Sequence, residues 1–387
     1  MTVVNIDKPG RMNIDIPIIT GHSAAVLDFD FNPFNDQIIA TGSEDTTVKV
    51  WGIPEGGLTE NITTPLVDLQ GHTRKVTLMS FHPTAENVLA TVGGENAVKL
   101  WDIQKGCEMN CLSTAHDQLI QDIVWDYTGK EYATSCKDKN IRIVDARSAT
   151  VANTIENAHD GAKSVKLTYT GRIGNLVSVG FTRQSQRQFK IWDPRNTSTE
   201  LEKIDIDQAA GVIMPFFDAD TNLLFLAGKG DGNVRYYELS SDSPVYPLGD
   251  FRSSVSAKGM AWVPRRGLDV MACETARLMK LTTSSVEPLS FTVPRKSDSF
   301  QEDLYPDTAS SIPAHSADEW MAGSELPPVE MAMNPTLRAT AAAASPVEKK
   351  VFHAVKSSSQ LLTELDIANA RIKELEDRLA AAGLSTD

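Results

Sequence analysis

The sequence predicts an all-β fold, a β-propeller that is followed by an extended arm and a short α-helical coiled coil. Three patterns carry this prediction: Gly-His pairs at a fixed distance from a tryptophan, a proline-rich stretch after the last repeat, and apolar residues that step by 3 and 4 near the C-terminus. The expected boundaries are 1–285 for the propeller, 286–330 for an arm that packs on it, 331–345 for a linker and 346–383 for the coiled-coil helix.

Two units show the repeat most clearly. His22 follows a glycine and precedes Trp51 by 29 positions, and His72 precedes Trp101 in the same way. Before each tryptophan the chain alternates apolar with polar residues, as in Val-Lys-Val-Trp, which is typical of a β-strand. This spacing is the signature of a WD repeat, in which each unit forms one propeller blade.

Four weaker units keep the rhythm. Val144 takes the tryptophan position of the third unit and Trp192 that of the fourth, whereas the turn and third strand are expected at 228–238 in the fifth unit and at 272–281 in the sixth. The tryptophan-equivalent positions 51, 101, 144, 192, 237 and 281 are 43 to 50 residues apart. That period corresponds to one blade per unit.

Each unit can hold its strands together with a buried polar network. Asp45 lies six residues before Trp51 and can accept a hydrogen bond from His22, which can reach a Ser or Thr hydroxyl and the indole N–H. Glu95 stands in the place of Asp before Trp101, so a longer and looser network is expected there. Repetition in several units favours a structural over a catalytic role. The expected network residues are His22, Asp45, Trp51, His72, Glu95, Trp101, His116, Asp138, His159, Trp192 and Asp231.

Composition indicates a protein that is neither secreted nor embedded in a membrane. Hydrophobic residues make up 41% and charged residues 23% of the 387 positions, and the longest apolar runs, such as 223–227, are far shorter than a membrane span. Four cysteines in a chain of this length do not form a disulfide framework, and no spacing of Cys or His suggests a metal site. A reducing compartment is expected.

The net charge of −14 argues against a surface built for nucleic acid. Residues 298–387 hold 15 acidic and 7 basic positions, which leaves 36 acidic and 30 basic for residues 1–297. The propeller is therefore close to balanced and can present local basic patches.

An enzyme is not expected. The sequence has no phosphate-binding Gly-x-x-x-x-Gly-Lys-[Ser/Thr] loop, no Gly-x-Ser-x-Gly elbow and no His-Glu-x-x-His motif. No catalytic, cofactor-binding or metal-binding residue is assigned.

The residues after the repeats change character. Six prolines between 286 and 330 exclude long regular elements, and Ser345, Pro346 and Glu348 form a helix start with a capping box. Apolar positions then step by 3 and 4, which is typical of a coiled coil; a lone amphipathic helix that docks on the propeller is the alternative. Arg371 and Glu376 stand where helices of a parallel coil form ion pairs. The expected core residues are Leu361, Leu365, Ile372, Leu375 and Leu379.

A WD propeller with a Pro-rich arm and a terminal coil resembles coronin, a family of actin-binding proteins. The most specific stretch is Thr292-Val-Pro-Arg-Lys-Ser-Asp-Ser-Phe-Gln-Glu-Asp-Leu-Tyr-Pro-Asp-Thr308, and 180–188, 228–231 and 264–269 also match. The resemblance covers roughly residues 10–330 and, in kind, the coil. It implies a propeller of seven blades whose first blade is largely missing here, because Met1 falls inside the expected last strand of that blade and about 60 residues are absent.

The resemblance implies a scaffold that binds actin filaments through the propeller, multimerises through the coil and organises or bundles filaments in the cytoplasm at the actin-rich cortex. Further implied partners are the actin-nucleating complex of actin-related proteins and other copies of the chain, with a trimer favoured over a dimer or tetramer. A generic WD adaptor for peptides or for proteins unrelated to actin is the alternative. No cofactor is implied. Candidate actin-binding cations are Lys137, Lys139, Arg183, Arg187, Arg265, Arg266, Arg295 and Lys296.

Overall fold

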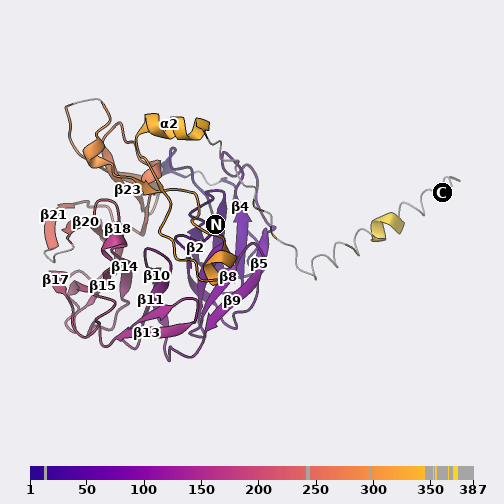
Figure 1. Ribbon diagram of the computed structural model, residues 1–387, viewed down its shortest axis with the longest axis horizontal. Helices are drawn as coiled ribbons and strands as arrows, with labels where there is room; N and C mark the ends of the chain where they lie inside the picture. The colour runs from indigo at the N-terminus through magenta and orange to yellow at the C-terminus, as the bar shows by residue number, and fades with distance from the viewer. Residues whose placement is uncertain are drawn as a thin grey trace.

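The computed structural model describes residues 1–12, 15–240, 245–296 and 299–344, together with 352, 354, 365 and 369–373. Within these residues it contains a ring of six four-stranded antiparallel sheets (Figure 1). The first strands of neighbouring sheets contact one another, so they line the centre of the ring. The fold is therefore an all-β propeller with six blades in the described part of the chain.

Each of the first three blades uses four strands in chain order, so sequential hairpins build it. The first blade contains β2 (Val26–Phe31), β3 (Ile38–Ser43), β4 (Val48–Gly52) and β5 (Val67–Leu69). The second contains β6 (Val76–Phe81), β7 (Val88–Gly93), β8 (Val98–Asp102) and β9 (Cys107–Leu112). The third contains β10 (Ile120–Trp125), β11 (Glu131–Cys136), β12 (Ile141–Asp145) and β13 (Thr150–Ile155).

The fourth and fifth blades repeat this order, and the last blade borrows a strand. The fourth contains β14 (Lys166–Tyr169), β15 (Leu176–Phe181), β16 (Arg187–Trp192) and β17 (Glu202–Asp207). The fifth contains β18 (Ile213–Asp218), β19 (Leu223–Gly228), β20 (Val234–Leu239) and β21 (Val245–Phe251). The sixth contains β22 (Gly259–Trp262), β23 (Glu274–Leu281), β24 (Ser285–Thr292) and, as its fourth strand, β1 (Gly10–Arg11) from the N-terminus.

The sixth blade corrects two expectations. The segment expected to hold its third strand, 272–281, holds its second strand β23, and the third strand is β24. The expected end of the propeller at 285 is the first residue of β24, so the blade continues to Thr292. The second and third strands of a blade share one alternating pattern, and this unit has no Gly-His pair and no Trp at the end of its third strand to tell them apart.

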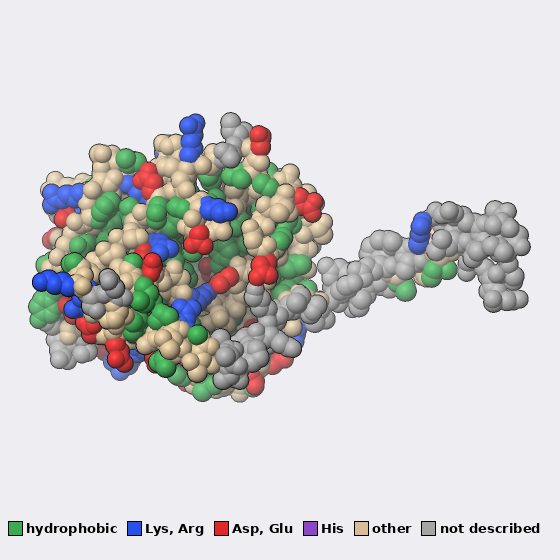
Figure 2. All heavy atoms as spheres, turned by 90° about the horizontal axis from the view of Figure 1, so that it is seen from above, with side chains coloured by type: hydrophobic (Ala, Val, Ile, Leu, Met, Phe, Trp, Pro, Cys, Tyr) green, Lys and Arg blue, Asp and Glu red, His purple; other side chains and the backbone are tan. Residues whose placement is uncertain are grey.

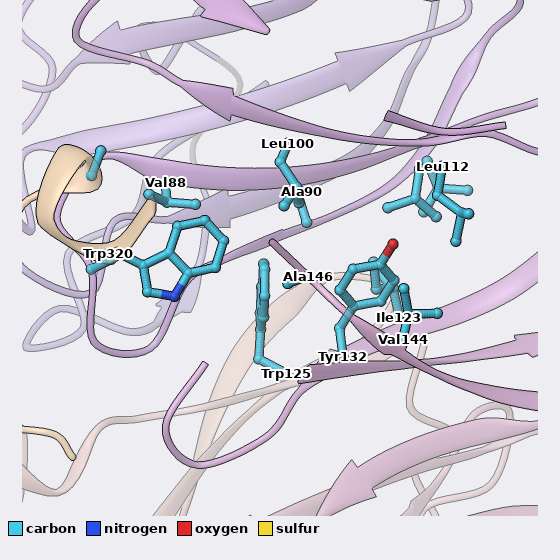
Figure 3. Close-up of a cluster of buried hydrophobic side chains, with 14 of the residues drawn as sticks. Val88, Ala90, Leu100, Leu112, Ile123, Trp125, Tyr132, Val144, Ala146 and Trp320 are labelled. Carbon is cyan, nitrogen blue, oxygen red and sulfur yellow. The ribbon is translucent and has the colours of Figure 1, made fainter. Parts of the chain in front are cut away.

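Apolar side chains between neighbouring blades form the core. One cluster joins the first two blades and contains Val48, Val50, Val76 and Phe81, while another joins the second and third blades through Val88, Leu100, Trp125 and Tyr132 (Figure 3). Where a sheet packs on two neighbouring sheets, its central strands are buried on both faces, as the fully buried β7 of the second blade shows. Strand β3 of the first blade is also fully buried, with N-terminal residues such as Ile19 packed against it.

The inner strand of the first blade lacks a neighbour on one face. Phe29 is 55% exposed and Phe31 43%, whereas the equivalent Met79 and Phe81 of the second blade are each 6% exposed. A hollow of about 470 Å³ lies beside this face. The ring is therefore open between its sixth and first blades among the described residues, and a seventh blade stays a prediction. Residues that line the hollow include Met1, Ile19, Val26, Leu27, Phe29 and Trp51.

The chain bridges the open side at two places. Residues near the N-terminus pack on the first blade, where the Met1 amino group donates to the Ile19 carbonyl, and then reach the sixth blade through β1. Arg266 of the sixth blade also pairs with Asp36 of the first at 2.6 Å. These contacts hold the two end blades together without burying Phe29.

The residues after the propeller form short elements on its surface. They are the 3₁₀ turn η3 (Glu302–Leu304), β25 (Thr308–Ala309), α1 (Ala317–Met321), β26 (Glu330–Met331) and α2 (Pro335–Ala344). We call residues 299–334 the terminal segment. Helix α2 occupies most of the expected linker, because a run of alanines has high helix propensity and Pro335 suits the first helical position. The expected helix start at 345–348 lies outside the described residues.

Candidate functional site

The WD network of the first two blades is a chain of buried hydrogen bonds. In the first blade His22 lies 2.9 Å from the Asp45 carboxylate and 2.8 Å from the Thr41 hydroxyl, to which the Trp51 indole N–H donates at 2.8 Å. In the second blade His72, Thr91 and Trp101 repeat this arrangement, and the Glu95 carboxylate lies 2.5 Å from His72. The network with Glu95 is thus not looser than that with Asp45.

The network changes in the next blades. His116 is hydrogen-bonded to Thr134 at 2.8 Å, but Asp138 accepts from Arg142 at 2.6 Å instead of from the histidine. In the fourth blade His159 and the Trp192 indole are both hydrogen-bonded to the Ser178 hydroxyl at 2.8 Å, and the Gln188 amide, 3.0 Å from His159, replaces the acidic partner. Asp231 of the fifth blade accepts a hydrogen bond from Arg187 at 2.8 Å. The first four blades thus share the histidine and hydroxyl, and the acidic partner varies.

Electrostatics in these networks suit a scaffold. Burial, together with Arg142, lowers the pKa of His116 to about 4, and burial with Lys190 lowers that of His159 to about 3. Burial favours the neutral form of Asp45, but hydrogen bonds from Thr47, His22 and the Ser23 N–H hold its pKa below the usual value. At neutral pH the imidazoles of His116 and His159 are therefore uncharged, and each ring can both donate and accept a hydrogen bond within its network.

The two ends of the ring differ because antiparallel strands alternate in direction. Two kinds of connection lie at one end of the ring, which we call the upper end. They are the connection between the second and third strands of a blade and the connection from its fourth strand to the next blade. The lower end carries the other two connections. Lys137, Lys139 and Arg183 lie at the upper end, in second-to-third-strand turns, and all three are exposed.

Three further candidate cations, the half-buried Arg266 and the exposed Arg295 and Lys296, lie at the lower end. Arg266 belongs to the 3₁₀ turn η2 (Arg265–Gly267) between β22 and β23, while Arg295 and Lys296 follow β24. Arg266 pairs with Asp36 and Arg295 with Asp303, whereas Lys296 is exposed. The eight candidates therefore do not form one surface.

Arg187 and Arg265 are buried, so neither belongs to a binding surface. Arg187 is 2% exposed and donates to Asp207 at 2.6 Å from two nitrogens and to Asp231 at 2.8 Å. Arg265 is 4% exposed and pairs with Asp218. These guanidinium groups join the fourth blade to the fifth and the fifth to the sixth. Buried charge of this kind is stable only when it is paired.

The terminal segment packs on the lower end, mainly through a tryptophan that sequence reasoning did not single out. Trp320 of α1 is fully buried against the rings of His82 and Trp125, with centroids 4.7 and 6.3 Å away (Figure 3). The Arg147 guanidinium lies 5.5 Å from its ring centre. A capping box of Ser316 and Glu319 starts α1, and this Ser-x-x-Glu pattern was the available sequence signal.

Acidic residues of the terminal segment pair with cations of four blades at the lower end. The pairs are Lys105 with Asp318, Lys130 and Arg147 with Glu325, Arg172 with Glu330, and Arg295 with Asp303. The segment therefore neutralises most of the positive charge at this end.

Only part of the expected coiled coil is described. Leu365 and residues 369–373 are helical, and Leu365 and Ile372 are 56% and 52% exposed. Arg371 lies in this helix. The other expected core positions, Leu361, Leu375 and Leu379, and the ion-pair partner Glu376 lie outside the described residues.

Among the described residues, no helix is long and apolar enough to cross a membrane. Nor does this part of the chain bring together three or more His, Cys, Asp or Glu side chains that could hold a metal ion.

Known proteins match this chain in sequence and in fold. Models described as "WD domain, G-beta repeat" match residues 15–52, 63–102 and 109–145, and one described as "Type of WD40 repeat" matches 286–328. Coronin-A of Dictyostelium discoideum is 45% identical over 367 residues, which is 94% of this chain and 81% of that protein.

Solved structures agree with these matches. The crystal structure of the WD40 domain from Toxoplasma gondii coronin superposes with a TM-score of 0.79 at 31% identity and covers 82% of each chain. A chain of the mitotic checkpoint complex shares the fold alone, with a TM-score of 0.55 at 16% identity over 71% of this chain and 77% of that one. With nearly half of its residues identical to Coronin-A along almost its whole length, the chain belongs to the coronin family.

Proposed function

We propose that this protein is a scaffold that binds actin filaments through its propeller and is multimerised by its C-terminal helix. Membership of the coronin family carries the proposal, since Coronin-A is 45% identical to this chain over 94% of its length. The scaffold would organise or bundle filaments at the cytoplasmic actin cortex and could engage the nucleating complex of actin-related proteins.

Exposed cations support the contact with actin. Lys137, Lys139 and Arg183 share the upper end, where they can meet the acidic surface of a filament. Such contacts are individually weak and screened by salt. A protein that binds in this way needs several propellers on one assembly to hold a filament firmly.

The C-terminal helix supports multimerisation. Leu365 and Ile372 lie seven residues apart and expose apolar side chains to solvent, which favours burial against another helix. Joining propellers in this way raises avidity by about 10²- to 10⁴-fold without new contacts. Three strands remain the favoured state, with two or four as alternatives.

Co-sedimentation with actin filaments at low and physiological salt tests the proposal. The whole chain is compared with its Leu365→Gln/Ile372→Gln variant, which weakens the seam without changing the net charge. We expect the whole chain to pellet at both salt concentrations, and the variant to be monomeric by analytical ultracentrifugation, to pellet weakly and to be released by salt. A folded chain that stays in the supernatant at low salt would contradict the proposal.

A further inference from the structure

The propeller is electrically polar along its axis, although the whole chain has a net charge of −14. Exposed cations occur at the upper end in the connections of the second, third, fourth, fifth and sixth blades. They are Arg74, Lys75, Lys137, Lys139, Arg183, Lys229, Arg252 and Lys258. Exposed acids at this end are fewer, namely Glu44, Asp117, Glu156, Asp160 and Asp250.

Most of these cations have no acidic partner within the described residues. The exceptions are Lys75, whose ammonium lies 3.9 Å from Glu44, and Arg252, which pairs with Asp250 at 2.6 Å. Lys139 donates to the Asp160 carbonyl at 2.8 Å, which positions its ammonium group without neutralising it. The cations of the upper end therefore keep their charge available to a partner.

Two of the four acids in the upper-end networks are neutralised inside the propeller. Asp138 pairs with Arg142, and Asp231 pairs with Arg187. Asp45 and Glu95 are hydrogen-bonded to network histidines, which positions these carboxylates without neutralising them. Both lie below the exposed turns, where the cations are more numerous than the exposed acids.

The lower end has the opposite character. Its cations on the second, third and fourth blades pair with acids of the terminal segment, and Arg195 of the fourth blade pairs with Asp193. The terminal segment adds exposed acids such as Glu302 and Asp318. On the rim seen in Figure 2, Lys and Arg are mixed with Asp and Glu. Only the upper end is predominantly basic.

We infer that the upper end is the surface that faces the filament and that the lower end, covered by the terminal segment, faces away. This inference rests on the proposed function and names the contact surface of that function. An acidic partner is drawn to the end with unpaired cations, because each pair at the lower end would have to be broken before it could contribute. Cations from several blades at one end also allow contacts to be spread over a broad, flat partner.

Two full-length variants that change the charge by the same amount test this assignment. Lys137→Glu/Arg183→Glu reverses two upper-end cations, and Arg195→Glu/Lys203→Glu reverses two exposed cations at the lower end of the fourth blade. We expect the first variant to bind filaments at least about tenfold more weakly in co-sedimentation and the second to stay within about twofold of the unaltered chain. Circular dichroism melts must coincide, since all four changes lie at exposed positions.

The outcomes separate the inference from the proposed function. If the unaltered chain pellets but both variants weaken equally, or if only the lower-end variant weakens, the assignment of the upper end is wrong while filament binding stands. If the unaltered chain does not pellet, filament binding itself is wrong and the assignment falls with it.

Discussion

Thr41 is the residue on which the hydrogen-bond chain of the first blade converges. Its hydroxyl meets both His22 and the Trp51 indole, and it is 1% exposed. Thr134 has the same place in the third blade, but Val144 there supplies no indole, so its hydroxyl meets His116 alone. The same fold position therefore carries different numbers of buried hydrogen bonds.

Replacing these threonines by valine separates the two cases. Thr41→Val leaves two buried polar groups without a partner and is expected to lower the free energy of unfolding by about 2–3 kcal/mol. Thr134→Val leaves only the His116 ring nitrogen Nε2 without a partner and is expected to lower the free energy of unfolding by about 1 kcal/mol. Urea unfolding measures both, and equal losses would show that the indole bond adds nothing.

The carboxyl group of Asp30 is expected to make the free energy of unfolding depend on pH. Burial raises the pKa of this carboxyl to about 7, even though the Phe81 N–H donates to it at 2.8 Å. Because the folded-state pKa lies above the unfolded value, its contribution to stability is present at low pH and is lost as pH rises through about 7. Asp30 is partly exposed, so solvent screening reduces the effect.

Asp30→Asn keeps an oxygen that accepts from Phe81 and removes the titration. We expect the variant to be more stable than the unaltered chain at pH 8, by about 1–2 kcal/mol, and nearly equal to it at pH 4. Thermal melts at the two pH values measure the difference. A gain of the same size at both would rule out the carboxyl as its source.

At the scale of the residue, the spacing between Gly-His pairs and tryptophans predicted which residue types form the hydrogen-bond networks, because each WD unit places them at the same positions of its blade. It did not predict that Arg187 and Arg265 are buried. A basic residue in an exposed turn and one in a buried ion pair look alike in sequence. Asp207 and Asp231, the acids that pair with Arg187, become its neighbours only in the folded ring.

Strand β2 has the sequence of a buried strand but is exposed on one face, since no described sheet packs on it. Phe29→Ala is therefore expected to change the free energy of unfolding by less than about 1 kcal/mol, whereas Phe81→Ala, from a position 6% exposed, is expected to cost about 3–5 kcal/mol. Urea unfolding of the two variants checks this contrast. Comparable losses would mean that the face of β2 is covered in solution.

Helix α1 anchors the terminal segment through Trp320. Trp320→Ala is expected to remove about 3–5 kcal/mol of packing and to release the segment, which would then be cleaved rapidly in limited proteolysis. Leu326→Ala, at a position 47% exposed in the same segment, is the matched control and should resist cleavage like the unaltered chain. Equal resistance of both variants would show that Trp320 does not hold the segment.

At the scale of the element, the repeat period predicted the blades, whereas short connecting elements were harder to predict. Helix α1 spans five residues, too few for an apolar period, and α2 was hidden in an alanine run that also suits a linker. The third strand of the sixth blade was misplaced because nothing in that unit marks strand order.

At the scale of the whole molecule, the terminal segment gives the propeller two unlike ends. Its acids pair with lower-end cations, whereas most upper-end cations stay unpaired within the described residues. The sequence alone could not predict this polarity, because the cations of both ends alternate along the chain and only the folded ring separates them. A basic upper end would let a chain with a net charge of −14 meet the acidic surface of the proposed filament partner.

Electron cryomicroscopy of actin filaments decorated with the full-length chain tests this account most directly. The account predicts that the propeller ring is seen with its upper end, including Lys137 and Arg183, against actin, and with α1 and the rest of the terminal segment on the side away from the filament. A ring that faces the filament with the terminal segment, or bare filaments at saturating protein, would contradict it.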